Sequence, residues 1–140
     1  MTEAETLFGE EHVRRYRETD GDVGYIWKRG SKTLLLTTFG RRSGQPTTTP
    51  LIYENAGDDY VVVASKGGAP VHPGWYRNLT NNPTVEVQVK DEVFKAHART
   101  ATGDERERLW KLAAQQWPDY DAYQTRTERE IPVVVLEREA

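Results

Sequence analysis

The sequence feature that most constrains the fold is a pair of strand-like segments separated by a short turn. Residues 33–39 and 47–53 are rich in Thr and Leu, and the turn between them contains Gly-Arg-Arg-Ser-Gly-Gln-Pro. Three consecutive leucines at 34–36, flanked by threonines, predict a strand that is buried on both faces. Pro50 removes a hydrogen-bond donor from the second segment, so that strand is predicted to lie at a sheet edge or to bulge there.

The turn itself combines two glycines with Arg41, Arg42 and Ser43. Glycine allows the backbone to turn tightly and to approach a ligand closely. Consecutive backbone N–H groups in such a turn form a concave anion site, and adjacent guanidinium groups add charge and forked donors. The turn therefore indicates a phosphate or carboxylate site at one end of a β-structure, although an ordinary hairpin turn with solvated arginines has the same composition.

A second segment of this kind follows a buried strand predicted over residues 60–64. It reads Ser-Lys-Gly-Gly at 65–68 and again places a hydroxyl, a cation and paired glycines at one end of a sheet. If residues 47–53 and 60–64 pair as a hairpin, Ser65 and Lys66 lie near the glycine-arginine turn.

A third segment begins at Pro73, which suits the first position of a short helix that Asn-Asn-Pro at 81–83 ends. The free N–H groups near Gly74 and Trp75 at the start of this helix form another site that favours anions. Trp75 offers a flat apolar wall for an aromatic ligand, and the same pattern also fits an ordinary core tryptophan.

The remaining segments predict helices, an antiparallel hairpin and an aromatic group. Helices are predicted over residues 5–20, over 102–116 behind a capping box at Thr102 and Glu105, and in a short stretch capped by Asp119. Strands are predicted at 25–28, 84–90, 93–100 and 131–136, with the middle two as a half-solvated hairpin. Trp117, Tyr120 and Tyr123 form a group that fits either core packing or a substrate wall with proton donors.

Composition excludes several classes of function. The 140 residues predict one domain, with residues 1–24 as a helical arm and 25–140 as a barrel with helices. The net charge of −3 argues against a nucleic-acid partner, which requires a basic surface. The absence of cysteine and the scattered histidines predict no metal site. Neither a secretory signal nor a membrane-spanning run is visible, so we expect a cytoplasmic protein and leave open a peripheral membrane contact of the first helix.

Several motifs together resemble the deazaflavin-dependent nitroreductase family. The motifs are the segments 34–45, 64–69, 72–79, 82–83, 120–127 and 131–135, so the resemblance runs from about residue 33 to the C-terminus. It implies an α+β, mainly antiparallel split β-barrel with flanking helices, related to flavin reductases and pyridoxamine-phosphate oxidases. It also implies coenzyme F420, an 8-hydroxy-5-deazaflavin with a phosphate, a lactyl group and a polyglutamate tail.

The resemblance also implies roles for particular residues. The phosphate and tail are expected at Arg41, Arg42, Ser43 and Lys66, and one side of the deazaflavin at Thr47, Thr48, Thr49, Pro50, Leu51 and Ile52. Backbone contacts to the ring are expected from Val63, Ala64 and Ser65, and flanking contacts from Gly74, Trp75, Tyr76, Arg77 and Asn78. The substrate wall is expected at Trp117, Tyr120 and Tyr123; Tyr120 also touches the cofactor, and Tyr120, Tyr123 and Ser65 are the candidate catalytic groups.

Two positions depart from the family pattern. Thr47 stands where characterised relatives often carry a basic residue, and Trp117 stands where the nitroimidazole-activating member has a tyrosine. The resemblance implies hydride transfer from reduced F420 to a small-molecule acceptor, which is a quinone, a nitroaromatic or an activated alkene. The alternatives are a non-catalytic module that binds or stores F420 and an FMN-dependent oxidoreductase on the same fold. The oligomeric state is not indicated.

Overall fold

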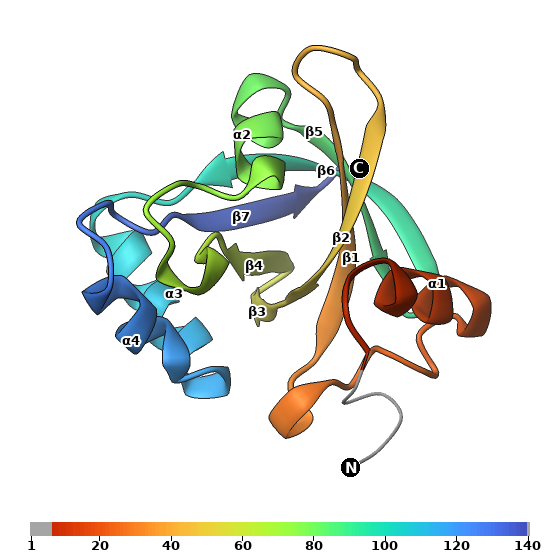
Figure 1. The fold of residues 1–140 in the computed structure, drawn as a ribbon, viewed down its shortest axis with the longest axis horizontal. Coiled ribbons are helices and arrows are strands. Elements are labelled where there is room, and N and C mark those ends of the chain that lie inside the picture. Colours follow the sequence, from red (N-terminus) through yellow and green to blue (C-terminus); the bar gives the residue numbers. More distant parts are fainter. Residues whose placement is uncertain (1–6, 140) are drawn as a thin grey trace.

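The computed structural model describes residues 7–139 and consists of a curled antiparallel sheet with two helices on its outer face and a short helix packed into its interior core (Figure 1). The strands are β1 (Thr33–Phe39), β2 (Pro46–Ile52), β3 (Glu54–Ala56), β4 (Asp59–Val63), β5 (Thr84–Val89), β6 (Glu92–Thr100) and β7 (Val133–Arg138). The helices are α1 (Gly9–Thr19), α2 (Gly74–Asn81), α3 (Gly103–Gln116) and α4 (Asp119–Thr125), with 3₁₀ turns η2 (Lys28–Gly30) and η3 (Lys66–Gly68). Residues 5–6 of the first predicted helix lie outside the described residues.

The seven strands form one sheet in the order β2-β1-β5-β6-β7-β4-β3, with every neighbouring pair antiparallel. The predicted hairpin at 84–100 is confirmed, because Val85 pairs with Ala96 and Val87 with Phe94. All four side chains are buried in the barrel interior, where the hydrophobic effect is the main stabilising term.

Strand β1 is buried on both faces, as its leucines predict. Leu34 and Leu36 belong to the core inside the barrel, whereas Leu35 packs against Val13 and Tyr16 of α1 on the outside. Successive side chains of a strand point to opposite faces, so one short leucine run joins the barrel to the N-terminal helix.

The chain bends at Tyr53, and this bend places one continuous segment at both edges of the sheet. Strand β2 pairs only with β1, and after the bend β3 pairs with β4. The prediction that Pro50 lies at a sheet edge is confirmed. The hairpin considered for residues 47–53 and 60–64 does not form, because the chain turns away at Tyr53 before it reaches β4.

A glutamine side chain satisfies the backbone groups beside the bend. Gln116, the last residue of α3, donates from Nε2 to the Tyr53 carbonyl over 2.6 Å, and its Oε1 accepts the Lys32 amide over 2.7 Å. These two backbone groups have no partner within the sheet ladder at this point, so the amide group of one side chain fastens α3 to both strands.

Three local predictions fail in detail. Only one bridge, between Ile26 and Lys32, forms where a strand was predicted at 25–28. Thr102 makes no side-chain capping hydrogen bond, and the Glu105 carboxylate, which would accept the Thr102 amide in a capping box, pairs instead with Arg99 of β6 at 2.6 Å. Asp119 lies in the first turn of α4 rather than at its cap, and it forms an ion pair with Arg29 at 3.1 Å.

Helix α1 packs on the outer face of the sheet through two buried polar side chains. His12 Nε2 lies 2.8 Å from the Gly24 carbonyl oxygen. The Tyr16 hydroxyl donates to the Thr33 carbonyl over 3.0 Å and accepts the Lys90 amide over 2.9 Å. Phe8, just before this helix, is 72% exposed.

We predict that Gln116→Leu destabilises the protein by about 1–3 kcal/mol, because it leaves a part-buried N–H and a part-buried C=O without partners. Urea unfolding measures the effect, and Gln115→Leu at the exposed neighbouring position is the matched control. An equal loss in both variants would contradict the role of Gln116 at the bend.

We also predict that stability falls in mild acid through His12. Burial lowers the pKa of His12, and the hydrogen bond to Gly24 offsets this only in part. The unfolded chain therefore takes up the proton more readily, so the free energy of unfolding decreases as pH falls below about 6.5 towards the lower folded pKa. Urea unfolding between pH 7.5 and 5.5 should show a smaller decrease for His12→Gln than for the wild type, and equal slopes would contradict the assignment.

Candidate active site

A cleft of about 500 Å³, which we call the central cleft, lies between β2, the loop after β4, the start of α2 and the aromatic residues around α4. Its aromatic lining residues are Phe8, Trp27, Trp75, Trp117, Tyr120 and Tyr123. Among the described residues, its charged lining residues are Lys28 and Lys66, and no carboxylate lines it. Flat apolar walls with positive charge and no negative charge are suited to an aromatic anion.

The central cleft brings together many of the residues that the sequence predicts. Those that line it are Thr49, Pro50, Leu51, Ile52, Val63, Ser65, Lys66, Gly74, Trp75, Trp117, Tyr120 and Tyr123. Those outside it are Arg41, Arg42, Ser43, Thr47, Thr48, Ala64, Tyr76, Arg77 and Asn78. Their roles towards a ligand stay predictions.

The glycine-arginine turn closes the β1–β2 hairpin, whose tip rises beside α2 (Figure 1). The Gly40 amide donates to the Gln45 carbonyl over 2.8 Å, and the Gly40 carbonyl accepts from the Gly44 amide over 2.9 Å. Arg42, within this tight turn, is exposed. Arg41 Nη1 reaches Asn78 Oδ1 of α2 at 3.3 Å. The first arginine of the turn is thereby held over the helix whose start lines the cleft.

Asn78 and Trp75 fix α2 in this position. The Asn78 side chain is buried and donates from Nδ2 to Thr38 Oγ1 over 3.2 Å. Trp75 is only 7% exposed and belongs to the barrel core, yet it also lines the cleft. Trp75 is therefore a core residue and, at the same time, part of the cleft wall.

Thr48 faces the other side of the sheet. Its hydroxyl lies 2.7 Å from Thr37 Oγ1 and accepts from Arg17 Nη2 of α1 over 3.0 Å. Thr47 and Thr48 line a groove against α1 on the outer face instead of the central cleft. Of the predicted segment 47–52, residues 49–52 line the central cleft, and the roles of Thr47 and Thr48 towards a ligand stay predictions.

The aromatic residues after α3 form one wall of the cleft. Tyr123 OH accepts a hydrogen bond from Trp117 Nε1 over 3.3 Å, and the Tyr120 ring lies edge-on to Tyr123 with a centroid distance of 6.2 Å. Burial, together with the neighbouring Tyr123, raises the pKa of Tyr120. A tyrosine hydroxyl is protonated at neutral pH in any case, and the raised pKa keeps Tyr120 a potential hydrogen-bond donor well above neutral pH.

Close packing of η3 against α4 brings Ser65 and Lys66 beside these tyrosines. Gly68 has a φ of 82°, and a Cβ added there would lie 2.5 Å from the Tyr123 carbonyl oxygen. Only glycine combines that conformation with that approach, which explains one of the paired glycines at 67–68.

The sequence did not indicate two groups of residues around the cleft. The Trp27 ring stacks on Trp117 at 6.1 Å with an interplanar angle of 17°, and Arg29 lies over the same ring at 4.5 Å. Arg129 contacts the loop after β4 from outside the cleft. Neither has a periodic pattern or a motif of its own, because each contact joins segments far apart in the sequence.

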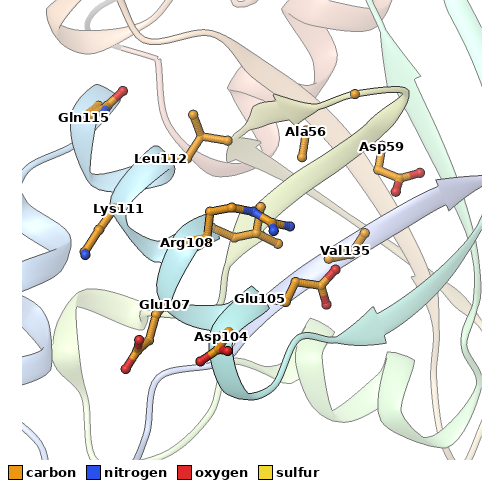
Figure 2. Close-up of a pocket in the computed structure, with 12 residues that line it drawn as sticks. Ala56, Asp59, Asp104, Glu105, Glu107, Arg108, Lys111, Leu112, Gln115 and Val135 are labelled. Carbon is orange, nitrogen blue, oxygen red and sulfur yellow. The ribbon is translucent and has the colours of Figure 1, made fainter.

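A larger hollow of about 760 Å³, which we call the α3 groove, lies between α3, the β3–β4 hairpin and β7 (Figure 2). Its charged lining residues are Asp59, Asp104, Glu105, Glu107, Arg108 and Lys111, and none of its lining residues is aromatic. Carboxylates outnumber cations there, so this groove repels the kind of ligand that the central cleft attracts. None of the predicted site residues lines it.

Comparisons with known proteins identify the family to which the chain belongs. A family model for F420H(2)-dependent quinone reductase matches residues 8–138. The F420H(2)-dependent quinone reductase Rv1261c of Mycobacterium tuberculosis is 43% identical over 130 residues, which cover 91% of this chain and 87% of that protein. The solved structure of an F420-H2 dependent reductase is 47% identical with a TM-score of 0.70, and the match covers 75% of this chain and 93% of that one.

A more distant structure shares the fold alone. A Listeria innocua protein named after pyridoxamine 5'-phosphate oxidase is 13% identical, with a TM-score of 0.54 over 77% of this chain and 84% of that one. The fold and these comparisons thus define an oxidoreductase of the split-barrel type. The chain belongs to the F420H(2)-dependent quinone reductase family.

These findings confirm the predicted split β-barrel and the predicted deazaflavin-dependent family. The matching family model is named for the reduction of quinones, whereas the resemblance was to a family named for the reduction of nitro compounds. The cofactor in that name is F420, and the FMN alternative has no support from the comparisons. No helix in the described part of the chain combines the length and apolar character needed to cross a bilayer.

We predict that replacing Arg42 and Lys66 together by Ala weakens F420 binding about tenfold at low salt and less at high salt. Dissolved salt screens the attraction between these cations and the anionic groups of F420, so their loss matters less there. Fluorescence titration at two salt concentrations measures this. Arg108→Ala with Lys111→Ala removes the same charge from the α3 groove and is the control. Unchanged affinity in the first variant would contradict the placement of the anionic groups.

Proposed function

We propose that this chain binds reduced F420 in the central cleft and transfers a hydride from it to a quinone. The observation that supports the proposal most is the cleft itself, where six aromatic side chains and two lysines meet and where none of the residues from 7 to 139 contributes a carboxylate. Bound F420H2 supplies the hydride, and the protein supplies binding, orientation and exclusion of water.

The residues around the cleft suit these three tasks. Trp75 is held rigidly by the barrel core and offers a flat wall. Lys66, with Arg41 and Arg42 on the hairpin, provides positive charge for a phosphate and a carboxylate tail. Holding an acceptor against a flat cofactor gives a proximity effect that needs no covalent chemistry from the protein.

Tyr120 and Tyr123 are the proposed donors towards the acceptor. A quinone that receives a hydride gains negative charge on one oxygen, which a nearby phenol stabilises by a hydrogen bond or a proton. Tyr120 is a protonated phenol whose pKa burial raises further, and Tyr123 presents a hydroxyl that accepts from Trp117. Ser65 is a third hydroxyl on the same wall.

The nature of the acceptor is the finer part of the proposal. A quinone is favoured because both the family and a relative of 43% identity are named for quinone reduction. A nitroaromatic or an activated alkene would use the same wall, and Trp117 in place of a phenol makes that wall more apolar. A module that only binds F420 would need the same cations but would not accelerate oxidation of the coenzyme.

The test is a fluorescence titration with F420 and FMN side by side, followed by stopped-flow oxidation of bound F420H2 by menadione and by a nitroaromatic. We expect binding of F420 in preference to FMN and faster oxidation by menadione than for free coenzyme. Binding without acceleration across a panel of quinones would contradict the reductase activity, and absence of F420 binding would contradict the whole proposal.

We predict that Tyr123→Phe lowers the turnover number for menadione about threefold to tenfold and leaves the dissociation constant of F420 within about twofold, because the lost hydroxyl faces the acceptor. Steady-state kinetics and coenzyme titration give both values. Tyr60→Phe, which changes a phenol outside the cleft, is the control. The reverse pattern would place Tyr123 against the cofactor.

A further inference from the structure

Arg129, in the segment between α4 and β7, fastens the loop that follows β4. Its Nε donates to the Ala69 carbonyl over 2.7 Å and its Nη2 donates to the Ser65 carbonyl over 2.7 Å. Its Nη1 donates to the Ala64 carbonyl over 3.3 Å and lies 3.0 Å from His72 Nδ1. One planar guanidinium thus holds four acceptors that lie within nine residues of one another in the sequence.

The charge of Arg129 has no carboxylate partner in the part of the chain that the structure describes, since none of the ion pairs there includes it. Burial lowers the pKa of Arg129, and burial with the charges of Arg129 and Arg77 lowers that of His72. A neutral His72 leaves Nδ1 free to accept. The guanidinium is therefore held by carbonyl dipoles and an imidazole.

These contacts determine which way the neighbouring amides point. In a trans peptide the C=O and the N–H lie on opposite sides. Because the carbonyls of Ala64 and Ser65 point to Arg129, the N–H groups of Ser65 and Lys66 point away from it, on the side where both residues line the cleft. Neither amide donates a hydrogen bond to any residue between 7 and 139.

The loop conformation also needs such a fastening. Lys66 has a φ of 46°, a left-handed conformation that costs free energy for a residue with a side chain. Gly67 and Gly68 continue it with φ values of 63° and 82°. Strained residues persist only where surrounding contacts hold them, and Arg129 donates to three carbonyl groups of this loop.

We propose that Arg129 is a positioning residue that turns the Ser65 and Lys66 amides into the central cleft, where they bind a carbonyl or an ionised oxygen of the coenzyme ring. The inference rests on the proposed function and assigns a role to a residue that does not touch the ligand. It extends the predicted backbone contacts of residues 63–65 by naming the side chain that orients them.

The test compares Arg129→Gln, Arg129→Lys and Arg106→Gln. Arg106 is the matched control, because it is also partly buried and donates to a carbonyl of the same segment, that of Ile131 at 2.7 Å, without contacting the 64–72 loop. In the coenzyme-free protein, amide chemical shifts and hydrogen exchange of Ser65 and Lys66 are followed by NMR. F420 affinity and the turnover number at saturating coenzyme are measured alongside.

We expect Arg129→Gln to change the Ser65 and Lys66 amide signals and to raise the F420 dissociation constant about tenfold, with a smaller effect on the turnover number at saturation. Arg129→Lys should recover part of the affinity, since an ammonium donates to one carbonyl at a time but lacks the fork. Arg106→Gln should leave the amide signals and the affinity near the wild-type values.

Unchanged Ser65 and Lys66 amides, or equal losses in Arg129→Gln and Arg106→Gln, would overturn the positioning role. If Arg129→Gln does not fold, Arg129→Lys carries the comparison, and wild-type behaviour in that variant would likewise overturn the role of the fork. A wild-type protein that ignores F420 contradicts the proposed function instead, and the amide signals still decide whether Arg129 orients the loop.

Discussion

The structure depends on the bend at Tyr53, because a single segment of chain has to serve as both edges of the sheet. Strand β2 completes one edge and β3 the other. Backbone groups at the bend cannot join the ladder, and Gln116 satisfies two of them from outside the sheet. The barrel is therefore not closed by hydrogen bonds at this point, and the residues just before the bend, 49–52, are those that line the central cleft.

The cleft shows that local charge, and not net charge, describes the kind of ligand. The chain carries a net charge of −3, yet the charged lining residues of the central cleft are lysines. Carboxylates are concentrated elsewhere, including the groove between α3 and the β3–β4 hairpin. An anionic aromatic molecule is thus attracted to one hollow and repelled from the larger one, which bears on function more than the volume of either.

The sequence predicts the parts of the fold that depend on local patterns. Alternation of Val85, Val87 and Val89 predicted the hairpin, and the leucines of β1 predicted a strand buried on both sides, because burial follows the period of the strand. The capping box at Thr102 failed because Arg99, brought close by β6, competes for Glu105. The ion pair between Arg99 and Glu105 thus replaces the local capping bond that the sequence predicts.

The same reasoning explains which site residues were missed. Segments with a turn or a helix start carry composition signals, so residues 65–66 and 74–75 were predicted from their own patterns, whereas residues 49–52 were implied by the family resemblance; all of them line one cleft. Gln116 and Arg129 act on backbone groups 63 and 64 positions earlier in the chain, at Tyr53 and Ser65. A single glutamine or arginine has no period and no motif, so only the folded structure shows what it holds.

The most direct test of the account is an NMR map of amide and indole signals on adding oxidised F420 to the full-length protein. The account predicts the largest changes at Ser65, Lys66 and Trp75, with the Trp117 indole affected and residues 104–115 of α3 unchanged. Changes centred on the α3 groove, or none at all at a coenzyme concentration in large excess over the protein, would contradict it.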